Sequence, residues 1–131
     1  MIDLDNQIVR ERIFIGIGVV MTVGLIGVAL LPISGEGTDT LLEYSALHYF
    51  LHFFSFAVFA CVWHRGNPRL PVLYLGLAII VFAFIHETLE IPGHNHEFEP
   101  WDVLADSAGV VVGLAIFLIT LPVVANKKVA K

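Results

Sequence analysis

The residues of this chain that could do chemistry are histidines and carboxylates beside or inside long apolar segments. They are His48 and His52, then His86, Glu87 and Glu90, then Asp102 and Asp106, with His96 in the loop before the last pair. His48 and His52 are four residues apart, so a helix places them about 40° apart on one face. Asp102 and Asp106 have the same spacing and fall on one stripe of a later helix.

Imidazole and carboxylate groups at these spacings suit a divalent metal ion bound through nitrogen and oxygen, and they also serve as general bases. Carboxylates that lie close together must share protons, pair with protonated histidine or hold a cation. No metal-binding motif such as HExxH fixes the identity of an ion. The sequence therefore predicts a polar site with a divalent metal as one candidate cofactor.

Three interpretations of these groups are open. A solvated rim at the helix ends explains the polar residues of the loop 94–99. It fits Asp106 poorly, because an ionisable group inside an apolar segment usually faces the interior of a bundle. A structural network would hydrogen-bond the helices to one another. A functional pocket would bind a polar head group or a metal ion.

The composition excludes most soluble proteins of this size. Of 131 residues, 57% are hydrophobic and 15% are charged, against about 45–50% and about 25% in soluble domains. The mean hydropathy is +0.84. A net charge of −5 offers no basic surface for nucleic acid, and the single Cys61 excludes a disulfide framework. We expect a membrane protein.

Four apolar segments are each long enough to cross a bilayer, which takes about 20 helical residues. They cover 13–31, 46–63, 70–91 and 103–124, and their boundaries are marked by Pro32, the turn Asn67-Pro68-Arg69, Pro92 and Pro122. A cleaved signal peptide at 1–35 is disfavoured, because the first apolar run is longer than such signals use. The prediction is an all-α integral membrane four-helix bundle, with residues 1–131 forming one domain.

All basic residues fall on one side of such a bundle. Arg10 and Arg12 precede the first segment, Arg65 and Arg69 lie between the second and third, and Lys127, Lys128 and Lys131 follow the fourth. The positive-inside rule makes this side cytoplasmic. Both termini are then cytoplasmic, and the histidines and carboxylates lie in the outer third of the membrane. We expect a multi-pass protein of the plasma or inner membrane.

The last two apolar segments resemble the signature of the VanZ-like membrane proteins. Glu87-Thr88-Leu89-Glu90 is similar to the family's Glu-x-x-Gln. Asp102 and Asp106, with the glycines at 109 and 113, are similar to its Asp-x-x-x-Asn-x-x-Gly-x-x-x-Gly. His52 and the phenylalanines after it are similar to the family's early His-Phe segment, a place that His48 could also fill. The likeness covers about residues 44–120.

Three positions depart from the family's pattern. Glu90 stands where the family has Gln, Asp106 where it has Asn, and a loop histidine, His96 or His94, where it has Arg. Each change introduces an acidic or titratable group. The departures therefore favour a site that is sensitive to pH or to metal ions.

The resemblance implies a protein of the bacterial cell envelope, linked to low-level resistance to the glycopeptide antibiotic teicoplanin. We expect the polar site to engage an envelope lipid or a cell-wall precursor. Two alternatives are a metal-dependent intramembrane hydrolase or transferase acting on a lipid-linked substrate, and a structural or assembly subunit. The residues expected to bind are His52, Glu87, Glu90, Asp102 and Asp106, supported by His48, His86 and His96.

Overall fold

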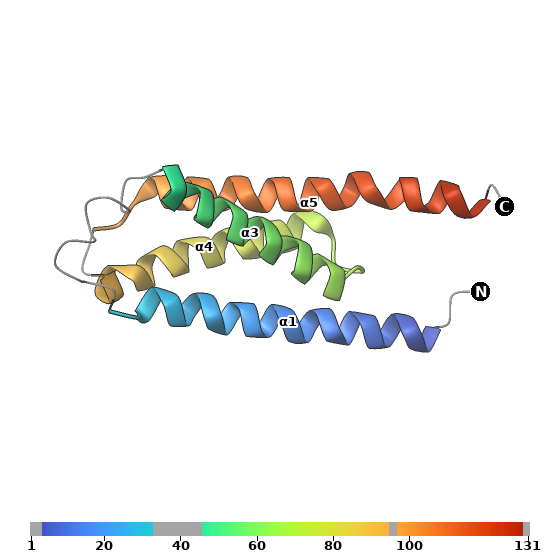
Figure 1. Cartoon of the computed structure of the whole chain (residues 1–131), viewed down its shortest axis with the longest axis horizontal. Coiled ribbons are helices and arrows are strands. Elements are labelled where there is room, and N and C mark those ends of the chain that lie inside the picture. Colours follow the sequence, from blue (N-terminus) through green and yellow to red (C-terminus); the bar gives the residue numbers. More distant parts are fainter. Residues whose placement is uncertain (1–3, 33–45, 95–96, 130–131) are drawn as a thin grey trace.

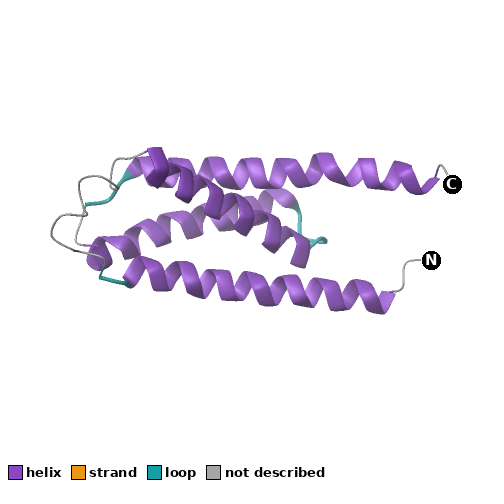
Figure 2. Cartoon of the chain, viewed as in Figure 1, coloured by secondary structure: helices purple, strands orange, loops and turns teal. Residues whose placement is uncertain are grey.

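The computed structural model describes residues 4–32, 46–94 and 97–129, and these ranges are helical apart from short connections. The helices are α1 (Leu4–Leu30), α3 (Ala46–Gly66), α4 (Val72–His94) and α5 (Pro100–Val129). In Figure 1, α1 and α5 form the long outer edges of the bundle and α3 and α4 lie between them. Figure 2 shows that the described residues contain no strand. The all-helical prediction is confirmed.

The surface of the bundle has the character of a membrane protein. Large apolar side chains face outward on every helix; Val20, for example, is 71% exposed and Leu73 is 70% exposed. Three helices, α1, α3 and α4, are long and apolar enough to span a bilayer. This confirms the expectation of a membrane protein. The fourth predicted span, 103–124, falls within α5.

The first helix extends beyond the predicted apolar segment. It begins at Leu4, not at residue 13, and ends at Leu30. Its first turns are stabilised by polar contacts: the Gln7 side chain donates to Glu11 across one turn at 2.9 Å, and Arg69 lies 3.3 Å from the same carboxylate. Because the predicted boundary followed apolarity, it marked the membrane-facing part of the helix and missed the polar turns before it.

Two prolines expected to mark boundaries lie inside helices. α4 continues through Pro92 to His94, and the backbone of α5 continues through Pro122 to Val129. Pro92 falls in the last turn of α4, where its missing N–H removes a single hydrogen bond and its fixed φ suits a helix. The turn at Asn67-Pro68-Arg69 is confirmed, with the Leu70 N–H donating to the Asn67 carbonyl at 3.0 Å.

Helices α3 and α5 start at the same end of the bundle, run parallel and make the closest pairing in the fold (Figure 1). A Cβ added to Gly109 would clash with the carbonyl oxygen of Phe53, and one added to Gly113 would clash with that of Ala57. The two glycines therefore bring the helix backbones into contact, as small residues do in membrane proteins. The buried core beside them consists of Phe56, Phe59, Ala60, Leu75, Ile79, Ala83, Val110 and Leu114.

This close approach predicts that Gly109→Ala destabilises the bundle. The added methyl group must push the α3 backbone away, and overpacking of this kind costs about 1–3 kcal/mol. We expect a lower Tm for the purified variant in detergent. Gly24→Ala is the matched control, because nothing lies within 4 Å of the added Cβ at that position. Equal Tm values for the two variants would contradict the contact.

Candidate functional site

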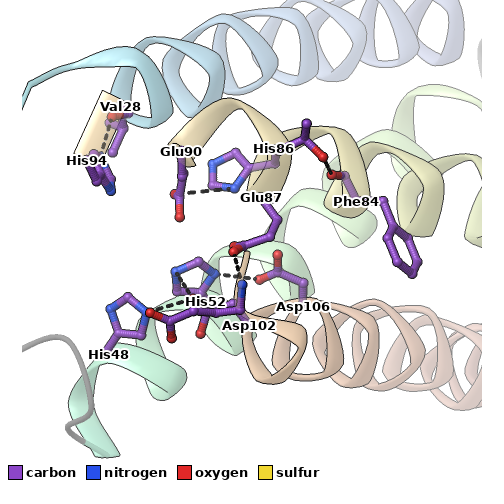
Figure 3. Close-up of polar contacts among 12 residues, drawn as sticks. Val28, His48, His52, Phe84, His86, Glu87, Glu90, His94, Asp102 and Asp106 are labelled. Carbon is purple, nitrogen blue, oxygen red and sulfur yellow. Dashed lines mark hydrogen bonds and ion pairs between the residues drawn. The ribbon is translucent and has the colours of Figure 1, made fainter. Parts of the chain in front are cut away.

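The histidines and carboxylates singled out in the sequence meet at one end of the bundle. The start of α3, the end of α4 and the start of α5 lie together there (Figure 1). They bring together His48, His52, His86, Glu87, Glu90, Asp102 and Asp106, which we call the polar centre (Figure 3). His96 lies outside the described residues.

Two histidine–aspartate contacts connect α3 to α5. His48 Nε2 lies 3.0 Å from Asp102 Oδ2, and His52 Nδ1 lies 3.1 Å from Asp106 Oδ1. The same four-residue spacing on two parallel helices produces both contacts, since each pair is separated by 54 positions in the sequence. His52 also approaches Asp102, with its Nε2 atom 3.9 Å from Oδ2. The two helices thus present one continuous row of alternating imidazoles and carboxylates (Figure 3).

Helix α4 supplies the opposite wall of the polar centre. Glu87 Oε1 accepts a hydrogen bond of 2.6 Å from the backbone N–H of Glu99, so the connection to α5 holds this side chain in place. His86 Nδ1 lies 3.5 Å from Glu90 Oε1, one helical turn away. The His86 ring also meets that of His52 edge to face, with centroids 6.1 Å apart.

The polar centre is strongly acidic and almost completely shielded from solvent. Its four carboxylate residues, Glu87, Glu90, Asp102 and Asp106, are each at most 3% exposed. The arginines, at positions 10, 12, 65 and 69, precede the first apolar segment or lie at the junction of α3 and α4, at the other end of the bundle. The lysines, at positions 127, 128 and 131, follow the last apolar segment in the sequence. Among the described side chains, positive charge within the polar centre can therefore come only from protonated histidine, or it must come from a bound cation. Burying a carboxylate without either one is costly.

Two aspartate oxygens in the polar centre lack a hydrogen-bond partner. Among the described residues, nothing pairs with Oδ1 of Asp102 or with Oδ2 of Asp106, although both atoms are buried. Buried polar atoms in folded proteins nearly always have a partner. These two oxygens therefore mark positions where the polar centre can accept a proton or coordinate a cation.

Side chains of the polar centre are close enough to share one ion. His48, His52 and Asp102 each offer one ligand atom, and these atoms lie within 4.8 Å of one another. Glu87, Glu90 and Asp102 form a second such group. Asp102 belongs to both groups and is the central carboxylate. The first group offers two nitrogens and an oxygen, and the second offers oxygen alone.

A shallow apolar groove of about 390 Å³ runs along α3 and α5 next to the polar centre. It is lined by Tyr49, Trp101, Leu104, Ala105 and Ala108. Tyr49 follows His48 in the sequence, and the two rings meet edge to face at 5.6 Å. The His48 side chain is 26% exposed, whereas that of Asp102 behind it is 1% exposed. The polar centre and the groove are thus linked through the neighbouring residues His48 and Tyr49.

The structure brings together seven of the eight residues expected to bind, but it does not test their role. His94 lies apart from them, with Nε2 3.2 Å from the carbonyl oxygen of Val28 on α1. Sequence reasoning missed the groove, although its α5 residues follow a helical i, i+3, i+4, i+7 stripe next to that of the aspartates. It also missed the backbone contact that holds Glu87 in place. The sequence does not show which backbone N–H group donates to a side chain, so nothing marked that of Glu99.

The contact between His52 and Asp106 predicts a measurable coupling energy. The Asp106 side chain is fully buried and that of His52 is 11% exposed, so removing one partner leaves the other largely desolvated and unpaired. A double-mutant cycle with His52→Ala and Asp106→Ala is expected to give about 1–3 kcal/mol of coupling in the free energy of unfolding. Arg69 and Glu11 form the control pair, and since Arg69 is 76% exposed their coupling should stay below about 1 kcal/mol. Equal coupling for the two pairs would rule out a special His52–Asp106 contact.

Comparisons with protein-family models, with curated proteins and with solved structures find no match to this chain. The likeness to VanZ-like proteins thus stays a prediction from the spacing of Glu87, Glu90, Asp102 and Asp106.

Proposed function

We propose that this is a VanZ-like membrane protein whose polar centre engages the polar head of an envelope lipid or of a lipid-linked cell-wall precursor. One observation carries the proposal: an apolar groove lies at the same end of α3 and α5 as the polar centre, and its lining residue Tyr49 directly follows His48. A ligand with a polar end and an apolar end fits this arrangement. The proposed effect on the cell is lower susceptibility to the glycopeptide teicoplanin, in line with the resemblance.

The surroundings of the groove favour a lipid as the occupant. The groove opens on the outer surface of α3 and α5, beside exposed apolar side chains such as Phe50 and Val111, which are 56% and 61% exposed. In a bilayer this surface meets acyl or isoprenoid chains. A chain lying in the groove would hold its head group next to His48, at the entrance to the carboxylates.

The chemistry of the polar centre restricts the head group. Carboxylates accept hydrogen bonds, so they favour hydroxyl or amine groups such as those of sugars, peptides and ethanolamine. A phosphate would be repelled by Glu87, Glu90 and Asp102 unless a cation lay between them. The head group that fits is therefore rich in donors, or is an anion bound through a metal ion.

The proposed topology has four spans, with both termini in the cytoplasm of a bacterium and the polar centre in the outer leaflet of its cell membrane. Its support is that all 7 Lys and Arg residues fall, in the sequence, on one side of the four predicted spans. α5, with 30 residues, has sufficient length for the fourth span. The outer leaflet is where lipid-linked cell-wall precursors are used, so the topology and the proposed ligand agree.

The topology predicts where C-terminal fusion partners are active. Green fluorescent protein fused after Lys131 is expected to fluoresce, because it folds in the cytoplasm. Alkaline phosphatase fused at the same residue is expected to be inactive there. A fusion of the phosphatase within residues 33–45 is the control and should be active. The reverse pattern would overturn the orientation.

A second candidate function is a metal-dependent hydrolase or transferase that acts on a lipid-linked substrate. The two groups of ligand atoms that meet at Asp102 favour it. In such an enzyme the metal ion would polarise the substrate or activate a water molecule. Buried carboxylates close to the ion would then be available as general bases.

Filling the groove is expected to block lipid binding. Ala108→Trp places a bulky ring in the groove, and Val20→Trp places the same ring on the exposed surface of α1, which does not line the groove. We expect the first variant to retain at least about 10-fold less co-purified lipid by native mass spectrometry, equivalent to about 1.4 kcal/mol. The second should match the wild-type protein.

Glu87→Ala should abolish protection against teicoplanin, and full protection in that variant would count against the polar centre.

A further inference from the structure

The two nitrogens of His52 face two different carboxylates. Nδ1 lies 3.1 Å from Asp106 Oδ1, and Nε2 lies 3.9 Å from Asp102 Oδ2. When Nδ1 carries the proton, it donates to Asp106, and the lone pair of Nε2 then points into the polar centre. Metal-binding histidines in proteins have this arrangement, since one ring nitrogen binds the ion while the other donates to a carboxylate.

The Asp102 oxygen that faces His52 is shared with His48. Oδ2 of Asp102 lies 3.0 Å from Nε2 of His48, so two imidazole nitrogens converge on one carboxylate oxygen. Lone pairs that face one another in a buried site repel. A proton or a cation among these three atoms removes that repulsion.

We infer that His48, His52 and Asp102 bind a first-row divalent transition-metal ion, with Asp106 as the residue that positions His52. The inference rests on the proposed function in one respect: the ion is the group that would hold an anionic or oxygen-rich lipid head at the polar centre. The metal is thus a structural prerequisite for such a ligand and needs no catalytic step.

The second oxygen of each aspartate also indicates uncompensated negative charge in the polar centre. Asp102 is 1% exposed and Asp106 is 0% exposed, and each has one oxygen without a partner among the described residues. Glu87 and Glu90 add two more buried carboxylates beside Asp102. When all four carboxyls are ionised, their charge exceeds what protonated His48 and His52 can neutralise, and this favours an ion of charge +2 over a monovalent one.

The donor atoms decide the class of ion. Two imidazole nitrogens and one carboxylate suit zinc, manganese, iron or cobalt, whereas magnesium and calcium prefer oxygen alone. With metal–ligand bonds of about 2.0–2.2 Å, neighbouring ligand atoms lie roughly 3.0–3.6 Å apart. The separations of 3.0 Å and 3.9 Å from Asp102 Oδ2 bracket that range. Small side-chain movements are therefore sufficient to coordinate an ion.

Three protein ligands leave a coordination position open, and the structure indicates which side it faces. His48 is the most exposed member of the group, with 26% of its side chain exposed, and its neighbour Tyr49 lines the groove. Glu87 and Glu90, which form the second group with Asp102, are buried. An open position toward the groove is where an oxygen of a lipid head group would reach the ion.

The test is metal binding to the full-length protein in detergent without added lipid. The protein is treated with a chelator, dialysed and titrated with Co²⁺, which is followed by its visible absorption, and with Zn²⁺ and Mn²⁺, which are followed by calorimetry. We expect about one ion per chain, with cobalt bands typical of nitrogen and oxygen ligands. Wild-type protein that binds none of the three ions would overturn the inference.

Variants separate coordination from a merely structural role. His52→Ala and Asp102→Asn should each weaken binding at least about 100-fold. Asp106→Asn should weaken it about 10- to 100-fold, which is the usual effect of losing the carboxylate behind a metal-bound histidine. His94→Ala is the matched control and should bind as wild type does, because His94 contacts Val28 on α1 instead.

Folding is checked by the helical circular dichroism signal of each variant. Asp106→Asn is the decisive variant if Asp102→Asn does not fold, because an asparagine oxygen can still accept from His52 Nδ1. Unchanged affinity in folded Asp106→Asn and His52→Ala proteins would contradict the assignment of ligands.

The outcome for the metal is distinguishable from the outcome for the proposed function. Lipid co-purification is measured on the same preparations before and after removal of metal. Wild-type lipid levels in protein that binds none of the three ions would overturn this inference and leave the proposed function standing. Stoichiometric metal binding with no co-purified lipid would support this inference and count against the proposed function.

Discussion

The organisation of this protein depends on one constraint: carboxylates buried in an apolar bundle must be compensated by positive charge. Asp102 and Asp106 are almost completely buried in α5, and Glu87 and Glu90 are equally buried in α4. In hydrocarbon each charge would cost at least about 2.5 kcal/mol. The fold lowers this cost by placing His48 and His52 directly against the aspartates. The histidine-to-aspartate contacts also set the register of α3 against α5.

The close approach of the two helices makes these contacts possible. The contacts of Gly109 with Phe53 and of Gly113 with Ala57 join positions 56 apart in the sequence, and the histidine–aspartate pairs join positions 54 apart. One parallel register thus satisfies both the small-residue contact and the polar contacts. A larger residue at either glycine would separate the backbones, so the short side chains of the aspartates could no longer reach the imidazoles. The apolar and polar parts of the interface therefore depend on each other.

Much of this arrangement could be predicted from the sequence, and the rest could not for identifiable reasons. The spacing of His48 and His52, and of Asp102 and Asp106, predicted two polar stripes, because helical periodicity fixes which residues share a face. Which imidazole faces which carboxylate depends on helix register, and hydropathy carries no information on that. Helix ends were misplaced at Leu4 and Pro92, since apolarity reports contact with lipid and not where backbone hydrogen bonds stop.

The departures from the VanZ-like pattern acquire a physical meaning in this structure. A family Asn at position 106 could accept one hydrogen bond from His52 but would bring no charge, and a Gln at position 90 would likewise be neutral. Compared with that pattern, Asp106 and Glu90 add two acidic side chains to the polar centre, and a histidine stands where the pattern has an arginine. This negative charge has to be neutralised within the polar centre itself. Protons can neutralise it only by binding to the carboxylates or to the histidine nitrogens, and this would remove the lone pairs that face one another around Asp102. A divalent ion neutralises the same charge and uses those lone pairs as ligands. The three differences from the VanZ-like pattern are therefore consistent with one another if a metal ion supplies the positive charge that the arginine has in that pattern.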